Sequence, residues 1–255
     1  MLLVHDSRHS AFGPRRTLAF PALARSSRAE ADPLAEPAGP PAAAHAVPPP
    51  SAPEIVVTRG KQIYLRTFTP PDLWHLDGWV DDPDLERLVG SEFLQLYRAY
   101  EKDPSFFEAV LMDPTQVVLV IVPYRERRPV GVVRLFGIHQ AEGYASIETI
   151  IGDPLASRRG YGVQASRLMA YWGVDTLSLR RLESRVYAYN PLSINTLKRN
   201  GFTQEGVLRQ AACRDGRYWD IIVFGILKDE IEEQRRKDKY LVPPDDVDGN
   251  GRDPS

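Results

Sequence analysis

The chain has a single cysteine, Cys213, and this scarcity excludes an internal disulfide and a cysteine-rich zinc site. Its five histidines show no metal-ligand spacing, so we expect no metal centre. No apolar run approaches the length needed to cross a bilayer, and we expect no membrane partner. The formal net charge of −2 does not favour nucleic acid as a partner either.

Composition divides the chain into three parts. Residues 1–54 are rich in proline and alanine and cannot bury enough apolar surface to offset their ordering entropy, which predicts a disordered extension. Its first part bears arginine and serine with almost no acid, as organellar transit peptides do, but we favour a variable start on a cytoplasmic protein. Residues 231–255 are charged and predict a fraying helix followed by a solvated tail.

Residues 55–230 show the periodicity of one folded domain. In its first half, three strands joined by short turns predict an antiparallel meander. The strand at 117–122 is apolar throughout, which is typical of a strand buried on both faces. The expected elements of this half are strands at 63–66, 117–122, 130–138 and 145–152, and helices from Thr69 to about Val80 and at 105–112.

The pattern changes in the second half, where strands alternate with helices. Asn200 and Gly201 form a good helix stop, and Arg214, Asp215 and Gly216 form a hairpin signal. This order predicts an α+β domain with a mixed, mostly antiparallel twisted sheet flanked by helices. The expected elements here are helices at 160–178 and 193–199, and strands at 182–189, 206–212 and 218–227.

The sharpest local feature is the loop Ser157-Arg-Arg-Gly-Tyr-Gly162, which joins a strand to a helix start. Its glycines let the backbone approach a ligand closely, and free N–H groups at a helix start suit a pyrophosphate. Arg158 and Arg159 add positive charge for phosphates. Two other interpretations stay open for the loop alone. Residues 160–165 also fit the dinucleotide fingerprint G-x-G-x-x-A, although the preceding meander counts against it, and a bare helix start needs no ligand.

The order of elements, with three motifs, resembles the GNAT superfamily of N-acetyltransferases over residues 57–230. The loop is similar to the motif [Q/R]-x-x-G-x-[G/A], with Ser157 at the Gln/Arg position. Asn190-Pro-Leu-Ser193, followed by Gly201-Phe202, resembles the N-x-x-S…G-F segment of the branch that acetylates ribosomal-protein N-termini. The hairpin at 206–220 resembles the closing hairpin of that branch.

This resemblance implies a GNAT fold whose two central strands splay apart, with acetyl-CoA bound in the gap as cosubstrate. Pantetheine would pair with backbone groups near Ile150 and Ile151, and the thiol end would lie beside Asn190 and Ser193. The residues expected to hold the pyrophosphate are Arg158, Arg159, Gly160, Tyr161, Gly162 and Val163.

The resemblance also implies direct acetyl transfer to a primary amine in a ternary complex, the acceptor being a protein N-terminus or a small amine. Because an alkylammonium has a pKa of about 10 and an N-terminal one about 8, a base must remove a proton. Glu148 is the candidate by position, and an ion pair with Arg134 on the neighbouring strand is the alternative.

The leaving thiolate also takes up a proton. Some branches place a tyrosine where this chain has Leu197, so that acid is absent. Ser193 is the candidate to hydrogen-bond the sulfur, with helix capping as its alternative role, and Tyr187 and Tyr189 lie nearby on the strand.

Two other functions stay open. A catalytically silent acyl-CoA sensor or interaction domain is supported by Ser157 and Leu197, which depart from the family pattern. A dinucleotide-dependent oxidoreductase is permitted by the loop alone. Sheet edges are frequent sites of self-association, so a homodimer is one expected assembly.

Overall fold

The computed structural model describes residues 53–99, 105–238 and 241. Residues 1–52 of the expected N-terminal extension and most of the expected solvated tail lie outside this range. None of the described helices is long and apolar enough to cross a bilayer.

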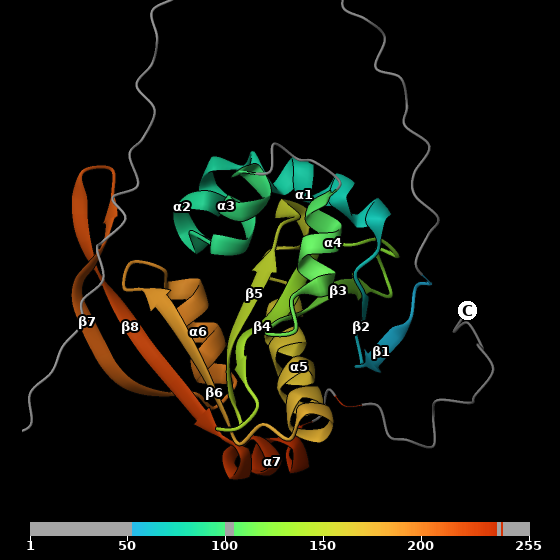
Figure 1. The fold of residues 1–255 in the computed structure, drawn as a ribbon. Coiled ribbons are helices and arrows are strands. Elements are labelled where there is room, and N and C mark those ends of the chain that lie inside the picture. The colour runs from blue at the N-terminus through green and yellow to red at the C-terminus, as the bar shows by residue number, and fades with distance from the viewer. Residues whose placement is uncertain (1–52, 100–104, 239–240, 242–255) are drawn as a thin grey trace, which may run out of the picture. The chain divides into compact units, whose positions relative to one another are not determined.

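Eight strands form one sheet in the order β1-β2-β3-β4-β5-β6-β8-β7 (Figure 1). Neighbouring strands are antiparallel except β5 and β6, which are parallel, so the mixed and mostly antiparallel sheet is as predicted. The strands are β1 (Val56–Arg59), β2 (Ile63–Thr67), β3 (Val117–Pro123), β4 (Gly131–His139), β5 (Tyr144–Ile151), β6 (Arg181–Tyr187), β7 (Thr203–Arg214) and β8 (Arg217–Leu227).

The helices cover the sheet in two groups. The first four gather in one region of Figure 1, whereas the β7–β8 hairpin projects away from the other strands. The helices are α1 (Leu73–Val80), α2 (Pro83–Val89), α3 (Glu92–Ala99), α4 (Ser105–Met112), α5 (Tyr161–Leu177), α6 (Pro191–Arg199) and α7 (Lys228–Arg236), with short 3-10 turns at Pro70–Asp72 and Pro154–Ala156.

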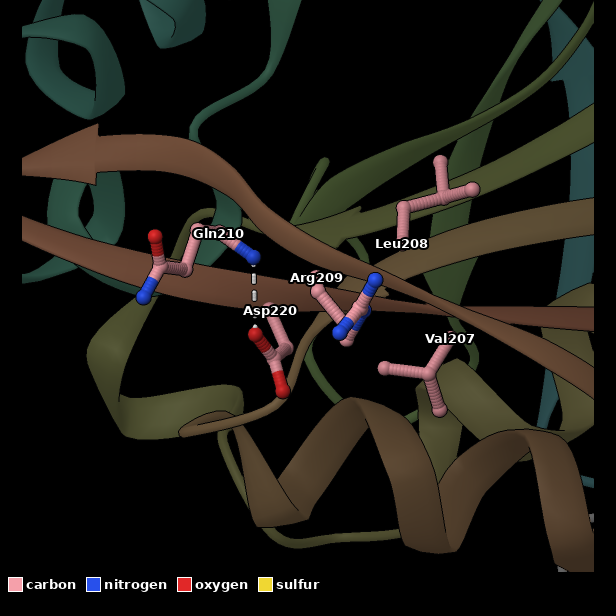
Figure 2. Close-up of a pocket in the computed structure, with 5 residues that line it drawn as sticks. All are labelled: Val207, Leu208, Arg209, Gln210 and Asp220. Atoms are coloured by element: carbon pink, nitrogen blue, oxygen red, sulfur yellow. Dashed lines mark hydrogen bonds between the residues drawn. The ribbon is translucent and has the colours of Figure 1, made fainter.

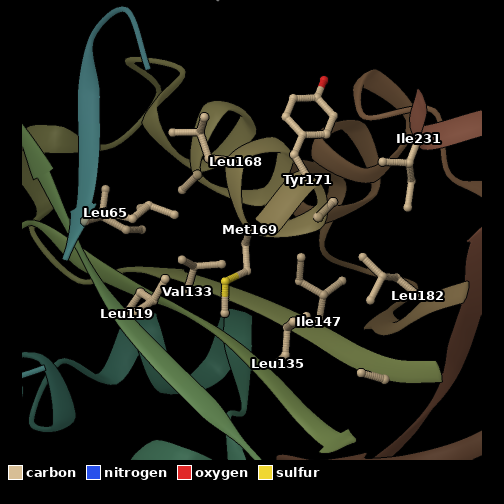
Figure 3. Packing of buried hydrophobic residues seen from close by; sticks show 14 of the residues in the cluster. Leu65, Leu119, Val133, Leu135, Ile147, Leu168, Met169, Tyr171, Leu182 and Ile231 are labelled. Carbon is tan, nitrogen blue, oxygen red and sulfur yellow. The ribbon is translucent and has the colours of Figure 1, made fainter. Parts of the chain in front are cut away.

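Each face of the sheet carries its own hydrophobic core because side chains alternate along the strands. On β3, Leu119 and Ile121 join the core under α5, whereas Val118, Val120 and Val122 join the core under α1, α3 and α4. Met169 of α5 is directed toward the strand residues of the first core (Figure 3). The apolar run therefore forms a strand buried on both faces, as predicted.

The structure differs from the sequence prediction at several element ends. Strand β1 and helices α2 and α3 were not predicted, and β6 ends at Tyr187 instead of Tyr189. Helix α6 begins at Pro191, two residues early, with Asn190 as its N-cap. The charged run begins as helix α7, in which Ile231 is buried against the core, and the Asp238 carboxylate that follows it accepts a hydrogen bond from Tyr171 at 2.9 Å.

The β7–β8 hairpin turns at Asp215 and Gly216, which have φ angles of 52° and 71°. Arg214 pairs with Arg217 across this two-residue turn. Positive φ at both central residues matches the right-handed twist of the flanking strands. The Asp-Gly signal was thus sufficient to place the hairpin.

Candidate acyl-coenzyme A site

Strands β5 and β6 pair only at their beginnings. Their parallel register covers three residue pairs and ends at Ser146 and Glu183. Beyond that point the two strands are not paired in the described part of the chain, so residues 147–151 face no strand on that side. An open strand edge offers backbone N–H and C=O groups to an extended ligand. The gap expected between the central strands is therefore present.

Residues 152–160 lead the chain from the end of β5 into α5. Arg158 and Gly160 both adopt left-handed backbone conformations, with φ angles of 62° and 85°. Glycine adopts this conformation without steric cost, and Gly160 is the residue that precedes the helix. Outside the helix, the Gly160 carbonyl accepts the Gln164 N–H at 3.1 Å. This is the first hydrogen bond of the helix, so the N–H groups of residues 161–163 have no partner within the helix. Together with the helix dipole, these N–H groups favour an anion.

The two arginines of the loop have different surroundings. Arg159 donates to the Leu155 carbonyl at 2.8 Å and pairs with Glu126 at 3.3 Å, yet its side chain is 41% exposed. Glu126 also accepts a hydrogen bond from the Tyr161 hydroxyl at 3.0 Å. Burial, followed by this bond, raises the pKa of Tyr161, which keeps the phenol neutral. Arg158 is exposed, so its charge is directly available at the helix start.

Helix α5 lies against one face of β5. The hydroxyls of Thr149 and Ser166 are 2.8 Å apart and join strand to helix. Ile151 belongs to the core under α5, whereas Ile150 is fully buried in the core on the opposite face. A Cβ added at Gly162 would lie 3.5 Å from Ile151 Cγ1, an ordinary van der Waals contact, so the first turn of α5 lies beside the end of β5.

Glu148 lies on β5 directly opposite Arg134 of β4. Its Oε2 accepts hydrogen bonds from Arg134 Nε at 2.6 Å and from Ser91 Oγ at 3.0 Å. The Arg134 guanidinium also lies over the rings of Phe93 and Phe136, at 5.3 and 4.1 Å from their centroids. The ion pair that the sequence offered as the alternative role of Glu148 is therefore present. Its Oε1 accepts no hydrogen bond from the described residues.

Asn190 is buried where β6 passes into α6. Its Oδ1 accepts the Ser193 N–H at 3.1 Å, and its Nδ2 donates to Ser193 Oγ at 2.9 Å and to the Leu88 carbonyl at 2.7 Å. The cap of α6 is therefore Asn190, and the prediction that Ser193 is the alternative cap is wrong. Asparagine caps helices at least as well as serine, and the proline that follows it is favoured at the first helical position.

A short segment that the sequence did not reveal joins both sides of the gap, and we call residues 87–91 the 87–91 bridge. It contains the end of α2 and the residue before α3. Its two signals in the sequence, which were overlooked, are a helix start at Asp82-Pro83 and a stop at Gly90. Its contacts are Arg87 with the Tyr189 hydroxyl, Leu88 with Asn190, Gly90 with Tyr187, and Ser91 with Glu148.

A separate pocket lies at the bulge in edge strand β7 (Figure 2). The Gln210 N–H donates to Asp220 Oδ1 at 2.8 Å across it. Its lining contains none of the residues predicted to bind a cofactor, so the gap remains the candidate site. The pocket is lined by Val207, Leu208, Arg209, Gln210 and Asp220.

Comparison with known proteins agrees with this geometry. The model of the family described as acetyltransferase (GNAT) domain matches residues 62–203, which is more than half of the chain. The chain is 28% identical over 175 residues to alpha/beta-tubulin-N-acetyltransferase 9 of Mus musculus, covering 63% of this chain and 73% of the relative. It is 24% identical over 181 residues to an uncharacterized, SPbeta prophage-derived N-acetyltransferase of Bacillus subtilis, covering 68% and 94%.

Solved structures show the same fold. The spermidine N-acetyltransferase of Vibrio cholerae, crystallised in complex with CoA and spermine, superposes with a TM-score of 0.58. That alignment covers 67% of this chain and 98% of the other, at 21% identity.

Proposed function

This chain belongs to the GNAT acetyltransferase family and is an N-acetyltransferase, and on that premise we propose that it moves an acetyl group from acetyl-CoA to a primary amine by direct transfer in a ternary complex. The observation that carries the proposal is the separation of β5 from β6 beside the first turn of α5. An open strand edge and a helix start then lie together, and these suit an extended amide-bearing arm and a pyrophosphate respectively.

The cosubstrate fits the gap by the chemistry of its parts. The backbone at Ile150 and Ile151 would pair with the pantetheine amides, as a neighbouring strand would. Asn190 and Ser193 would lie beside the thiol end, from the far side of the gap. The pyrophosphate would be held by the helix start and the loop arginines, through Arg158, Arg159, Gly160, Tyr161, Gly162 and Val163.

Glu148 is the proposed base. Arg134 and Ser91 both bind its Oε2, which fixes the carboxylate and leaves Oε1 to accept a proton from the amine or from a bridging water. The amine must lose this proton because only its neutral form carries the lone pair that attacks the thioester. The ion pair thus positions the carboxylate.

Ser193 is the proposed hydrogen-bond donor to the sulfur. Its Oγ already accepts from Asn190 Nδ2, so the hydroxyl proton is free to point at another acceptor. A hydrogen bond to the developing thiolate stabilises charge that appears only as the carbon–sulfur bond breaks. Because the hydroxyl proton stays on Ser193, this role is stabilisation rather than proton transfer.

We propose a protein N-terminus or a small amine as the acceptor. The mouse relative carries tubulin in its name, and the Vibrio cholerae neighbour was crystallised with spermine. Both acceptor kinds present a primary amine to the family's site. The sharpest test follows thiol release from acetyl-CoA over a panel of peptides with free N-termini, polyamines and aminoglycosides.

Calorimetry in parallel identifies the nucleotide that binds. Acetyl-CoA binding together with thiol release on any panel member supports the proposal. Acetyl-CoA binding without release on any of them identifies the chain as a silent sensor. Binding of NAD in place of acetyl-CoA would overturn the assignment of the gap.

A further inference from the structure

Glu148 and Tyr187 lie on the same face of the sheet, on opposite sides of the gap. Ser146 Oγ lies 3.5 Å from Glu183 Oε1 where the strands still pair, which places these two side chains on one face. Residues two apart along a strand share a face, so Glu148 follows Ser146, and Tyr187 follows Glu183 by four residues. Helix α5 covers the other face. A thioester in the gap would therefore meet a carboxylate from one side and a phenol from the other.

The Tyr187 hydroxyl lies against Gly90 of the 87–91 bridge. A Cβ added at Gly90 would lie 2.3 Å from this oxygen, so the residue that precedes Ser91 makes room for it. Gly90 has a φ of 54°, a left-handed conformation that glycine adopts freely. Ser91 in turn binds Glu148. Two adjacent residues thus contact the proposed base and the Tyr187 hydroxyl.

Arg214 from the β7–β8 hairpin donates a hydrogen bond to the Tyr187 oxygen, and its guanidinium lies 5.0 Å from the ring centroid. The Tyr187 oxygen is the acceptor in this bond, and no described residue accepts a hydrogen bond from the Tyr187 hydroxyl proton. The hydroxyl is therefore arranged to donate a proton.

We propose that Tyr187 is the proton donor to the leaving thiolate, an inference that rests on the proposed acetyl transfer. The amine nitrogen attacks the thioester carbonyl and forms the C–N bond. The C–S bond then breaks with its electron pair on sulfur, and the Tyr187 proton passes to that sulfur. Glu148, directly or through water, takes the proton lost by the amine and releases it to solvent, and solvent returns a proton to the phenolate, so the products are amide and free thiol.

The neighbouring hydroxyls are less suited to this step. Tyr189 stacks on Tyr187 with centroids 5.2 Å apart, but its hydroxyl donates to the Arg87 carbonyl at 2.7 Å. Ser193 can hydrogen-bond the sulfur, but an aliphatic alcohol is a much weaker acid than a phenol. Leu197 is buried in the core and has no proton to give. An ordinary phenol, with a pKa of about 10, lies close enough to a thiol, at about 8.5, for efficient transfer.

The test compares Tyr187→Phe with the matched control Tyr189→Phe, in the full chain with a panel amine that the wild type acetylates. We expect Tyr187→Phe to lower kcat by about 10- to 100-fold, at or below the low end for general acids, because a thiolate leaves readily. The fall of kcat at alkaline pH, where the donor loses its proton, should disappear in this variant. Tyr189→Phe should stay within about threefold of the wild type.

Calorimetry with CoA and thermal melts on both variants show whether the fold and the cosubstrate site persist. Arg214→Gln supplies a second measurement, because loss of the hydrogen bond that positions the Tyr187 oxygen should lower kcat while CoA affinity persists. The inference would be overturned by any of three results. These are equal kcat values for the two phenylalanine variants, an unchanged alkaline fall of kcat in Tyr187→Phe, or loss of CoA binding by Tyr187→Phe. No thiol release by the wild type on any amine would instead overturn the proposed acetyl transfer, and this inference with it.

Discussion

The ion pair between Arg134 and Glu148 permits a test that separates catalysis from stability. The two side chains are 8% and 19% exposed, and Arg134 Nε lies 2.6 Å from Glu148 Oε2. Glu148→Gln therefore removes the proposed base and also leaves a buried guanidinium without its counter-charge. A loss of activity in this variant alone would have two explanations, so the perturbation must be made in two steps.

The first step should be costly to the fold. Breaking a buried ion pair by removing one partner costs about 3–5 kcal/mol. We expect about 3 kcal/mol for Glu148→Gln, because the amide oxygen still accepts from Arg134 and the faces of Phe93 and Phe136 still contact the guanidinium. For a domain of this size, that corresponds to a fall in Tm of about 6–12 °C.

The second step should restore stability. Adding Arg134→Met to Glu148→Gln removes the unpaired charge and places an apolar side chain between Phe93 and Phe136. Replacing a buried pair by well-packed neutral groups is often close to neutral, so the double variant should unfold within about 1 kcal/mol of the wild type. Urea unfolding of the four proteins gives the coupling free energy of the pair.

Activity is then the deciding measurement. If Glu148 takes the proton from the amine, the stable double variant should keep wild-type CoA affinity, while its kcat stays about 100-fold low and loses its rise with pH. Steady-state thiol release between pH 6 and pH 9, about the range where an N-terminal amine titrates, measures both. Recovery of kcat together with stability would refute the reasoning and leave the ion pair a purely structural one.

Three further predictions follow from the same site and its supports. Gly162→Ala should raise Tm by about 2–4 °C through helix propensity, yet weaken CoA binding about tenfold in calorimetry, because the new methyl group crowds the approach to the end of β5. Asn190→Ala should cost about 1–2 kcal/mol in urea unfolding, because the α6 cap and the bond to Leu88 are lost, whereas Ser193→Ala should stay within about 0.5 kcal/mol. Burial lowers the pKa of His75, so the folded chain binds fewer protons than the unfolded chain, and its stability should fall as the pH drops below about 6.5. His75→Phe should show less of this fall when unfolding is compared at the two sides of that pH.

The sequence was sufficient for the parts of the fold that local patterns determine. The buried strand β3, the hairpin at Asp215-Gly216 and the glycine-bearing start of α5 each have a signal within a few residues. The Arg134–Glu148 pair was also accessible as an alternative, because it joins neighbouring strands of a short-turn meander. The contacts across the gap were not accessible in this way.

The gap contacts join residues far apart in the sequence. Leu88 and Asn190 are hydrogen-bonded but stand 102 positions apart in the sequence, and Ser91 and Glu148 stand 57 positions apart. Pairings of this length depend on tertiary packing, which periodicity does not report. A closer local interpretation would nevertheless have improved two elements, because Asp82 and Asn190 each precede a proline and each caps a helix at that position.

The short pairing of β5 with β6 has a consequence for how this fold can vary. The sheet consists of two parts, β1 to β5 and β6-β8-β7, each with a complete hydrogen-bonded ladder of its own, and only three residue pairs join β5 to β6. A small rotation about these three pairs changes the width of the gap without breaking a ladder within either part. Substitutions in the 87–91 bridge, which spans the gap, can therefore alter which thioester and amine fit while both parts of the sheet stay intact.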